Sequence, residues 1–97
     1  MQKREYVLAL YEIYKKLLTE LEQKYFEYYY FEDYSMQEIA DALNVSKANV
    51  GKFINKIEVK LSKFEDSLNI YDTNNKLKEL IKDLDDKELK SKIEELL

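Results

Sequence analysis

The sequence contains no histidine, no cysteine and no proline, and it has one glycine among its 97 residues. The missing cysteines exclude disulfides and thiol nucleophiles, and the missing histidines remove the most common general base and metal ligand. Carboxylates such as Asp83, Asp85 and Asp86 stand beside lysines in a polar helical stretch. No glycine-rich phosphate loop is present. We therefore expect no enzyme, no catalytic residue, no metal site and no cofactor.

The scarcity of helix breakers predicts an all-α fold. A chain of this length suits one domain that buries about 60–70% of its unfolded surface. No apolar run approaches the roughly 18 residues of a membrane-spanning helix. Because no signal-peptide core is present either, we expect a cytoplasmic protein.

Residues 35–54 carry a helix-turn-helix pattern. Ser35 followed by Glu38 forms a capping box that starts the first helix. Asn44 stands at the tight turn, where a left-handed backbone is needed and Asn is tolerated after Gly. Ser46 caps the second helix. The positions expected to be buried in this motif are Ile39, Ala40, Leu43, Val45, Val50 and Phe53.

Hydrophobic periodicity places the other helices. The first is expected over about residues 2–18, and Thr19 then caps a second that ends near residue 32. The second helix of the motif continues to about Leu68, followed by a turn over residues 69–75 and one long or two short helices over 73–97. The expected architecture is a helix-turn-helix bundle (1–68) with a C-terminal helical extension (69–97), which packs on the same domain or on a partner chain.

Residues 25–31 form an aromatic cluster whose faces point in several directions. On a helical wheel, Tyr25, Tyr28 and Tyr29 share one face with Leu18 and Leu21, while Phe26 and Tyr30 point elsewhere. Such a cluster is typical of core packing, but one small chain cannot cover aromatic groups on every side. Exposed apolar patches mark interfaces. We therefore expect a homodimer that buries part of this cluster or the leucines of residues 77–97.

Charge is unevenly distributed around the net value of −4. Residues 19–42 sum to −6, whereas residues 43–64 sum to +4, and this basic block coincides with the second helix of the motif. Its lysines form either a solvated face or a face that follows phosphates. Asn can read adenine, and the lysines suit backbone contacts better than base reading. The candidate nucleic-acid-binding residues are Ser46, Lys47, Asn49, Lys52, Lys56, Lys60 and Lys63.

The run from Leu18 to Leu61, with its tyrosine-rich segment and the Glu32-Asp33-Tyr34-Ser35 step, resembles the YlxM family. These are small bacterial helix-turn-helix proteins similar to the fourth region of sigma factors. The resemblance covers about residues 6–68. It implies an all-helical, dimeric accessory of the signal recognition particle, a link that comes from gene neighbours encoding the particle's GTPase and its receptor.

Two classes of function remain open because the fold does not decide between them. One is a nucleic-acid-binding regulator, acting on transcription through DNA or on the particle through its RNA. The other is a protein-interaction module that has kept the helix-turn-helix scaffold without binding nucleic acid. The family resemblance favours a regulatory accessory of the signal recognition particle that binds nucleic acid, with the GTPase or its receptor as a further candidate partner.

Overall fold

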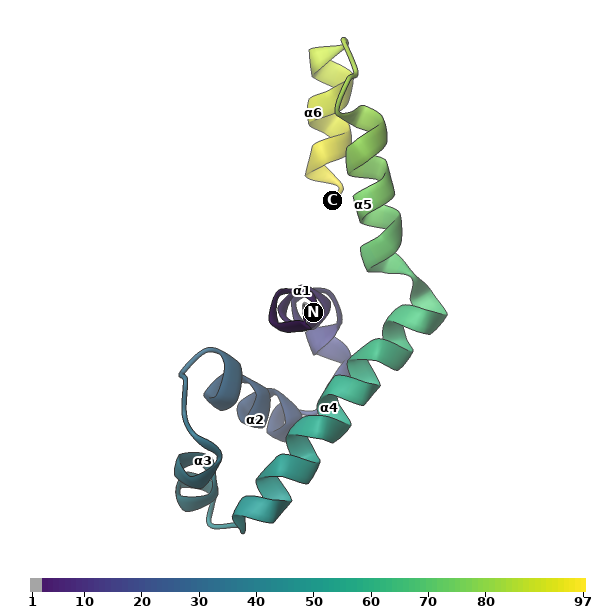
Figure 1. Ribbon diagram of the computed structural model, residues 1–97. Coiled ribbons are helices and arrows are strands. Elements are labelled where there is room, and N and C mark those ends of the chain that lie inside the picture. The colour runs from purple at the N-terminus through teal and green to yellow at the C-terminus, as the bar shows by residue number, and fades with distance from the viewer. Residues whose placement is uncertain (1–2) are drawn as a thin grey trace.

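The computed structural model describes residues 3–97, which contain α-helices and one short 3-10 helix but no strand. The molecule is elongated, about 55 × 26 × 25 Å, with a body of four helices and a helical hairpin that extends from it (Figure 1). The all-α expectation is therefore confirmed. The helices are α1 Lys3–Tyr14, α2 Glu20–Tyr30, α3 Met36–Leu43, α4 Lys47–Leu68, α5 Ile70–Ile81 and α6 Lys87–Glu95, with the 3-10 helix Lys15–Leu17 after α1.

The first helical segment, expected over about 2–18, is α1 followed by the 3-10 helix; residue 2 lies outside the described residues. Thr19 caps α2 as expected, because its hydroxyl accepts from the backbone N–H of Glu22 and the Glu22 carboxylate accepts from the backbone N–H of Thr19. Two reciprocal bonds thus satisfy groups that a helix start would leave unpaired.

The buried side of α2 is not confined to the face that Tyr25 shares with Leu21. Phe26 is fully buried and stacks on Tyr11 of α1 with ring centroids 4.0 Å apart, whereas Leu21 is half exposed. The reason is that α2 packs against both α1 and α4, so its buried side runs through Tyr25 and Phe26 together. The aromatic cluster is therefore mainly core. Phe31 remains half exposed at the end of the helix.

Helix α4 is the central element, since α1, α2 and α3 all contact it. Its core side repeats at helical spacing, as the sequence predicted, and Val50, Ile54, Ile57 and Leu61 are all buried. Leu68, at the end of the helix, is half exposed because the last turn of α4 extends beyond the body (Figure 1).

The turn expected over residues 69–75 is not there, because α5 begins directly at Ile70. Asn69 alone makes the turn, with a left-handed backbone at φ 55°. The buried carboxylate of Glu65 then caps α5, accepting from the backbone N–H of Tyr71 and of Asp72, each at 3.0 Å. A cap supplied from the preceding helix removes the need for a longer loop.

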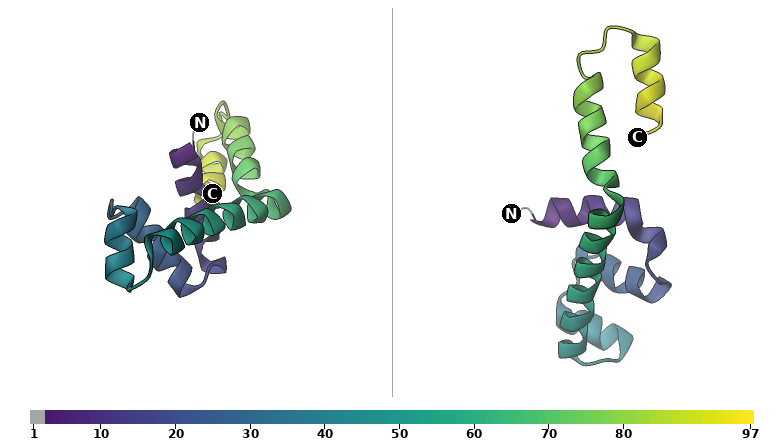
Figure 2. Two further views of the ribbon diagram at one scale, coloured as in Figure 1. Left: turned by 60° about the horizontal axis from the view of Figure 1, so that its bottom comes forward. Right: turned by 90° about the vertical axis from the view of Figure 1, so that its right-hand side faces the viewer.

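Helices α5 and α6 form an antiparallel hairpin (Figure 2), with Asp86 capping α6 through the backbone N–H of Leu89 at 3.0 Å. Asp85–Asp86 is thus the break that divides residues 73–97 into two helices. Besides packing on α6, α5 contacts α1, where Tyr71 meets Tyr6 edge-on. The division into a bundle (1–68) and an extension (69–97) stays a prediction. No helix within residues 3–97 is long and apolar enough to cross a membrane.

Candidate nucleic-acid interface

The helix-turn-helix motif is formed by α3 and α4. Ser35 and Glu38 make the predicted capping box, with N–H···O distances of 2.8 and 3.0 Å. Asn44 has the left-handed backbone that the pattern required, φ 57° and ψ 48°. Ile39, Ala40 and Val50 are buried together, which confirms the close contact of the two helices, whereas Leu43 and Phe53 are only partly buried.

Ser46 starts α4 as predicted. Its side-chain oxygen accepts from the backbone N–H of Asn49 at 3.0 Å, so the hydroxyl stabilises the helix start. Lys47, the first residue of α4, is exposed. Both residues thus stand at the start of the second helix, the part of a helix-turn-helix that contacts base edges in known complexes.

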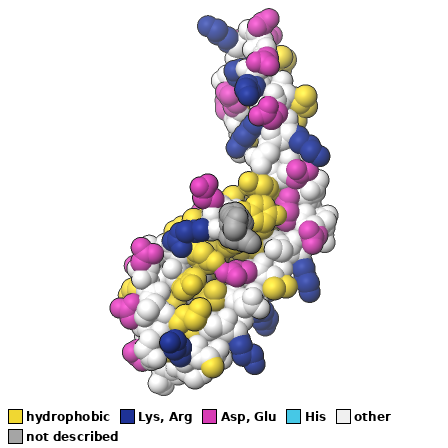
Figure 3. Space-filling view, viewed as in Figure 1, with side chains coloured by type: hydrophobic (Ala, Val, Ile, Leu, Met, Phe, Trp, Pro, Cys, Tyr) yellow, Lys and Arg dark blue, Asp and Glu magenta, His cyan; other side chains and the backbone are white. Residues whose placement is uncertain are grey.

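Three of the candidate lysines form an exposed row on the outer side of α4, and we call Lys52, Lys56 and Lys63 the lysine row. Figure 3 shows the basic side chains following this edge of the body. Within residues 3–97 none of the three makes an ion pair, and Lys56 lies at 5.9 Å from the centre of the Phe53 ring. Their ammonium groups are thus available to anions.

Lys60 is not a member of this row, although it is one of the candidate nucleic-acid-binding residues. Its Nζ lies 2.9 Å from both carboxylate oxygens of Glu22, which is 5% exposed in its side chain. Burial alone raises the pKa of Glu22, but the hydrogen bonds from Lys60 and Thr19 outweigh it and hold that pKa below its usual value. Lys60 therefore joins α4 to α2 and is not free to contact phosphate.

Asn49 is exposed, but its side chain is also engaged within the protein. The Tyr25 hydroxyl donates to its Oδ1 at 3.1 Å, and the Tyr25 ring stacks on Phe53 with centroids 4.1 Å apart. Reading adenine takes both the carbonyl and the amide of Asn. Because the carbonyl already has a partner, Asn49 in this position is not ready for that contact.

Gly51 does not lie on the face that carries the lysine row. It faces α3, and a Cβ added there would meet only the Met36 sulfur, at 3.7 Å. That is an ordinary van der Waals distance. The glycine is therefore not required by close packing, and it does not open the lysine row to a phosphate backbone.

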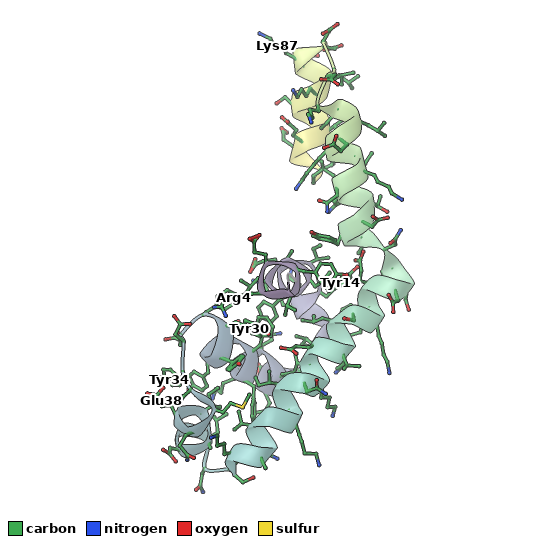
Figure 4. The ribbon with its side chains drawn as sticks, in the orientation of Figure 1. Arg4, Tyr14, Tyr30, Tyr34, Glu38 and Lys87 are labelled. Atoms are coloured by element: carbon green, nitrogen blue, oxygen red, sulfur yellow. The ribbon has the colours of Figure 1, made fainter. Side chains whose placement is uncertain are left out.

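The surface over α2 and α3 is acidic. Figure 3 shows carboxylates gathered at the edge of the body opposite the lysines of α4, and Figure 4 places Glu38 and Tyr34 at that edge. On α3, Glu38 and Asp41 are exposed, with Asp41 accepting from the Gln37 amide at 2.9 Å. No group of three or more acidic side chains within residues 3–97 is arranged to hold a metal ion. The α2–α3 side of the body is thus negatively charged, whereas the outer side of α4 is positively charged.

Sequence reasoning missed the partners of the candidate residues. Glu22 was not among the candidate residues, and Tyr25 was assigned only to the aromatic cluster, yet each binds a candidate residue on α4. The bonds join positions 38 and 24 residues apart. No local pattern signals such long-range pairs, although the odd placement of an acidic residue on the inner side of α2 was visible in the sequence.

The family model described as "Putative helix-turn-helix protein, YlxM / p13 like" matches residues 1–97. The chain belongs to the YlxM family. This match confirms the resemblance to the YlxM family and agrees with the helix-turn-helix geometry of α3 and α4. The description names a helix-turn-helix, which is a nucleic-acid-binding scaffold in many proteins.

Relatives occur in other bacteria, and two of the three described here match over nearly the whole chain. The UPF0122 protein of Ureaplasma urealyticum serovar 10 is 40% identical over 94 residues, which cover 97% of this chain and 95% of the relative. That of Lactococcus lactis subsp. cremoris (strain MG1363) is 35% identical over 101 residues, covering 99% and 91%. That of Streptococcus pyogenes serotype M5 is 39% identical over 71 residues, covering 73% and 63%.

Proposed function

We propose that this YlxM family member is a nucleic-acid-binding regulatory protein of the cytoplasm, with no enzymatic activity. The observation that carries the proposal is the lysine row on the outer side of α4, the second helix of the motif. Each phosphate contact by such a lysine releases counterions and strengthens binding at low salt. Lys47 adds a further positive charge at the start of the same helix.

The contacts are proposed to be with the backbone of the nucleic acid. The lysine row extends over residues 52–63 of α4, which at a rise of about 1.5 Å per residue is roughly 17 Å. Lysines are point charges that suit phosphates, while Asn49, the residue best suited to read a base, is held by Tyr25. Binding of this kind favours shape over sequence.

The proposed cellular role is an accessory of the signal recognition particle, acting as a homodimer. This finer assignment rests on the family resemblance. The nucleic acid is then duplex DNA or the particle's RNA, and the GTPase or its receptor is a further candidate partner. The acidic α3 supports RNA over duplex DNA, because the first helix of a helix-turn-helix crosses the DNA backbone and Glu38 and Asp41 would oppose phosphates there.

A second candidate function is a protein-interaction module that binds no nucleic acid. The observation in its favour is the acidic surface over α2 and α3, within a segment of net charge −6. Such a surface repels phosphates and attracts a basic protein partner. A transcription regulator that binds DNA is the third candidate.

One experiment separates these candidates. Fluorescence anisotropy of labelled duplex DNA and of the particle's RNA is measured against the protein over a series of salt concentrations, and the GTPase is titrated in parallel. The proposal expects binding to RNA whose logarithm falls linearly with the logarithm of salt concentration. Binding to DNA alone supports the transcription regulator. Absence of nucleic-acid binding even at low salt, with binding to the GTPase, supports the protein-interaction module.

A further inference from the structure

A groove lies between α1 and α4 beside the lysine row, and we call it the α1–α4 groove. Helix α1 crosses α4 steeply (Figure 2), so the two helices diverge next to their contact. All the residues that line the groove come from these two helices. Its volume is about 540 Å³, within the range of about 300–1,000 Å³ that is typical of small-ligand sites. The groove is therefore large enough to hold a small planar group.

The lysine row runs along the rim of this groove. Lys63 belongs both to the row and to the lining of the groove. Val59 lies between Lys56 and Lys63 along the helix, is 44% exposed and also lines the groove. At about 100° per residue, Val59 is rotated by about 40° from Lys63, away from Lys56. A ligand in the groove would thus lie directly beside the ammonium groups of the row.

The lining combines apolar surface with a few polar groups. Tyr6 and Val7 of α1 and Val59 of α4 provide the apolar side chains. Asn55 and Ser62 add hydrogen-bonding groups, and both are exposed. A nucleobase has the matching chemistry, because its faces stack on aromatic rings and its edges carry donors and acceptors.

Two carboxylates give the interior of the groove the opposite charge to its rim. Glu58 accepts the hydroxyl of Tyr30, whereas Asp66 makes no ion pair within residues 3–97. These carboxylates repel a phosphate from the interior, so the phosphates of a ligand must stay at the rim, near Lys56 and Lys63. A basic peptide side chain would be attracted by the carboxylates but repelled by the lysines. The arrangement favours a ligand with phosphates outside and an uncharged ring inside.

We propose that the α1–α4 groove holds the base of one unpaired RNA nucleotide, stacked on Tyr6, while Lys56 and Lys63 contact the phosphates on either side. This rests on the RNA binding proposed above and names the part of the RNA that is recognised. Unpaired bases in bulges and loops are free to stack on aromatic side chains, whereas paired bases are not. A carboxylate accepts from the amino group of cytosine, and uracil has an acceptor at that position. Asp66 therefore favours cytosine over uracil.

The site is tested with two RNA duplexes of the same sequence, one fully paired and one with a single bulged cytosine. Fluorescence anisotropy at one salt concentration gives both affinities. We expect the protein to bind the bulged duplex about tenfold more tightly, because only its base can stack in the groove. Equal affinities overturn the base site and leave binding along the lysine row intact. Binding to neither duplex, even at low salt, overturns the proposed function as well.

Filling the groove should remove the preference for the bulge. Ser62→Trp places a large side chain in the groove, and Ser67→Trp, on the same helix but outside the groove, is the matched control. Both serines are exposed, so both variants should fold, which circular dichroism checks. S62W should bind the two duplexes alike, whereas S67W should keep the tenfold preference. A preference that is lost in both variants, or kept in both, overturns the site.

The choice of base is tested with Asp66→Asn. Wild type should bind a bulged cytosine about fivefold more tightly than a bulged uracil, and D66N should bind the two within about twofold, because an amide can donate to the uracil oxygen. Asp83→Asn changes the net charge equally at an exposed position of the hairpin and should keep the fivefold preference. A preference in D66N equal to that of wild type overturns the role of Asp66.

Discussion

Lys60 and Glu22 form a bidentate ion pair across α4 and α2, with the lysine Nζ 2.9 Å from each carboxylate oxygen. The same carboxylate accepts from the backbone N–H of Thr19 at 2.8 Å. One side chain therefore completes a helix cap and fastens that helix to the centre of the fold. Lys60 was a candidate for binding nucleic acid because of its position on α4, but its contacts stabilise the fold.

Replacing Lys60 with Gln should destabilise the protein at neutral pH by about 1–3 kcal/mol, because the buried Glu22 carboxylate loses its charged donor. Lys63→Gln, which removes the same charge from an exposed position, is the control and should leave the midpoint of urea unfolding nearly unchanged. Equal midpoints for the two variants would show that the ion pair contributes nothing.

The effect of Lys60→Gln should depend on pH. The folded protein holds the pKa of Glu22 below its ordinary value of 4.5, so the ion pair contributes fully above that value. The contribution is lost as the pH falls through the lower folded pKa. Urea unfolding should therefore show a large difference between wild type and K60Q at about pH 7, and this difference should shrink as the pH falls below 4.5. A difference that stays constant would assign the loss to packing.

Much of the fold could be predicted because local signals decide it. Ser35 with Glu38 and Thr19 with Glu22 are capping boxes readable from four residues, and Asn44 marks a left-handed turn by its chemistry. Both signals depend only on the nearest neighbours in the chain. The bounds of α3 and α4 follow from them, and the family match agrees with the motif.

What could not be predicted depends on contacts across the chain. A wheel could not show which aromatic side chains of α2 are buried, because Tyr25 packs toward α4 and Phe26 stacks on Tyr11 of α1. The turn predicted over residues 69–75 was wrong, because Glu65 of α4 caps α5 and the helix can begin directly at Ile70. Lys60 and Asn49 were assigned to the candidate site from their place on α4, but their partners on α2 are 38 and 24 residues away.

Replacing Glu65 with Ala should loosen the start of α5. The carboxylate accepts the Tyr14 hydroxyl at 2.6 Å and two backbone N–H groups of α5 (Figure 4 shows Tyr14 beside this junction). Burial and this bond raise the pKa of the Tyr14 hydroxyl, so it stays a donor. Losing the acceptor leaves buried donors unpaired, at about 1–3 kcal/mol. Hydrogen exchange at residues 70–72 should accelerate more than in α3, and uniform acceleration would mean that the effect is global.

Replacing Gly51 with Ala should stabilise the protein by about 0.5–1 kcal/mol. Glycine within a helix costs about that much relative to alanine, and the added Cβ meets only the flexible Met36 side chain at an ordinary distance. Thermal unfolding measures the gain. A loss of stability would mean that α3 and α4 are closer at Met36 than their contact distance indicates.

Replacing Ala40 with Leu should destabilise the protein. Ala40 is 1% exposed, and its neighbours Ile39 and Val50 are fully buried between α3 and α4. A larger side chain there forces the two helices apart, at about 1–3 kcal/mol. Ala42→Leu, at an exposed position of the same helix, is the control and should change stability little. Unchanged thermal stability of A40L would mean that the helices do not pack at this position.

Removing the lysine row should weaken nucleic-acid binding without unfolding the protein. Lys52, Lys56 and Lys63 are exposed, so K52Q/K56Q/K63Q should keep the stability of wild type, whereas a triple that included Lys60 would not. The control is K78Q/K82Q/K87Q in the hairpin, which changes the net charge equally. Up to three lost phosphate contacts should flatten the slope of log affinity against log salt by up to about 2.7 on duplex DNA and about 2 on single-stranded RNA. Binding should weaken alike on different sequences, because the row contacts the backbone. If both triples change the slope equally, the effect is one of total charge, and the lysine row is a solvated face.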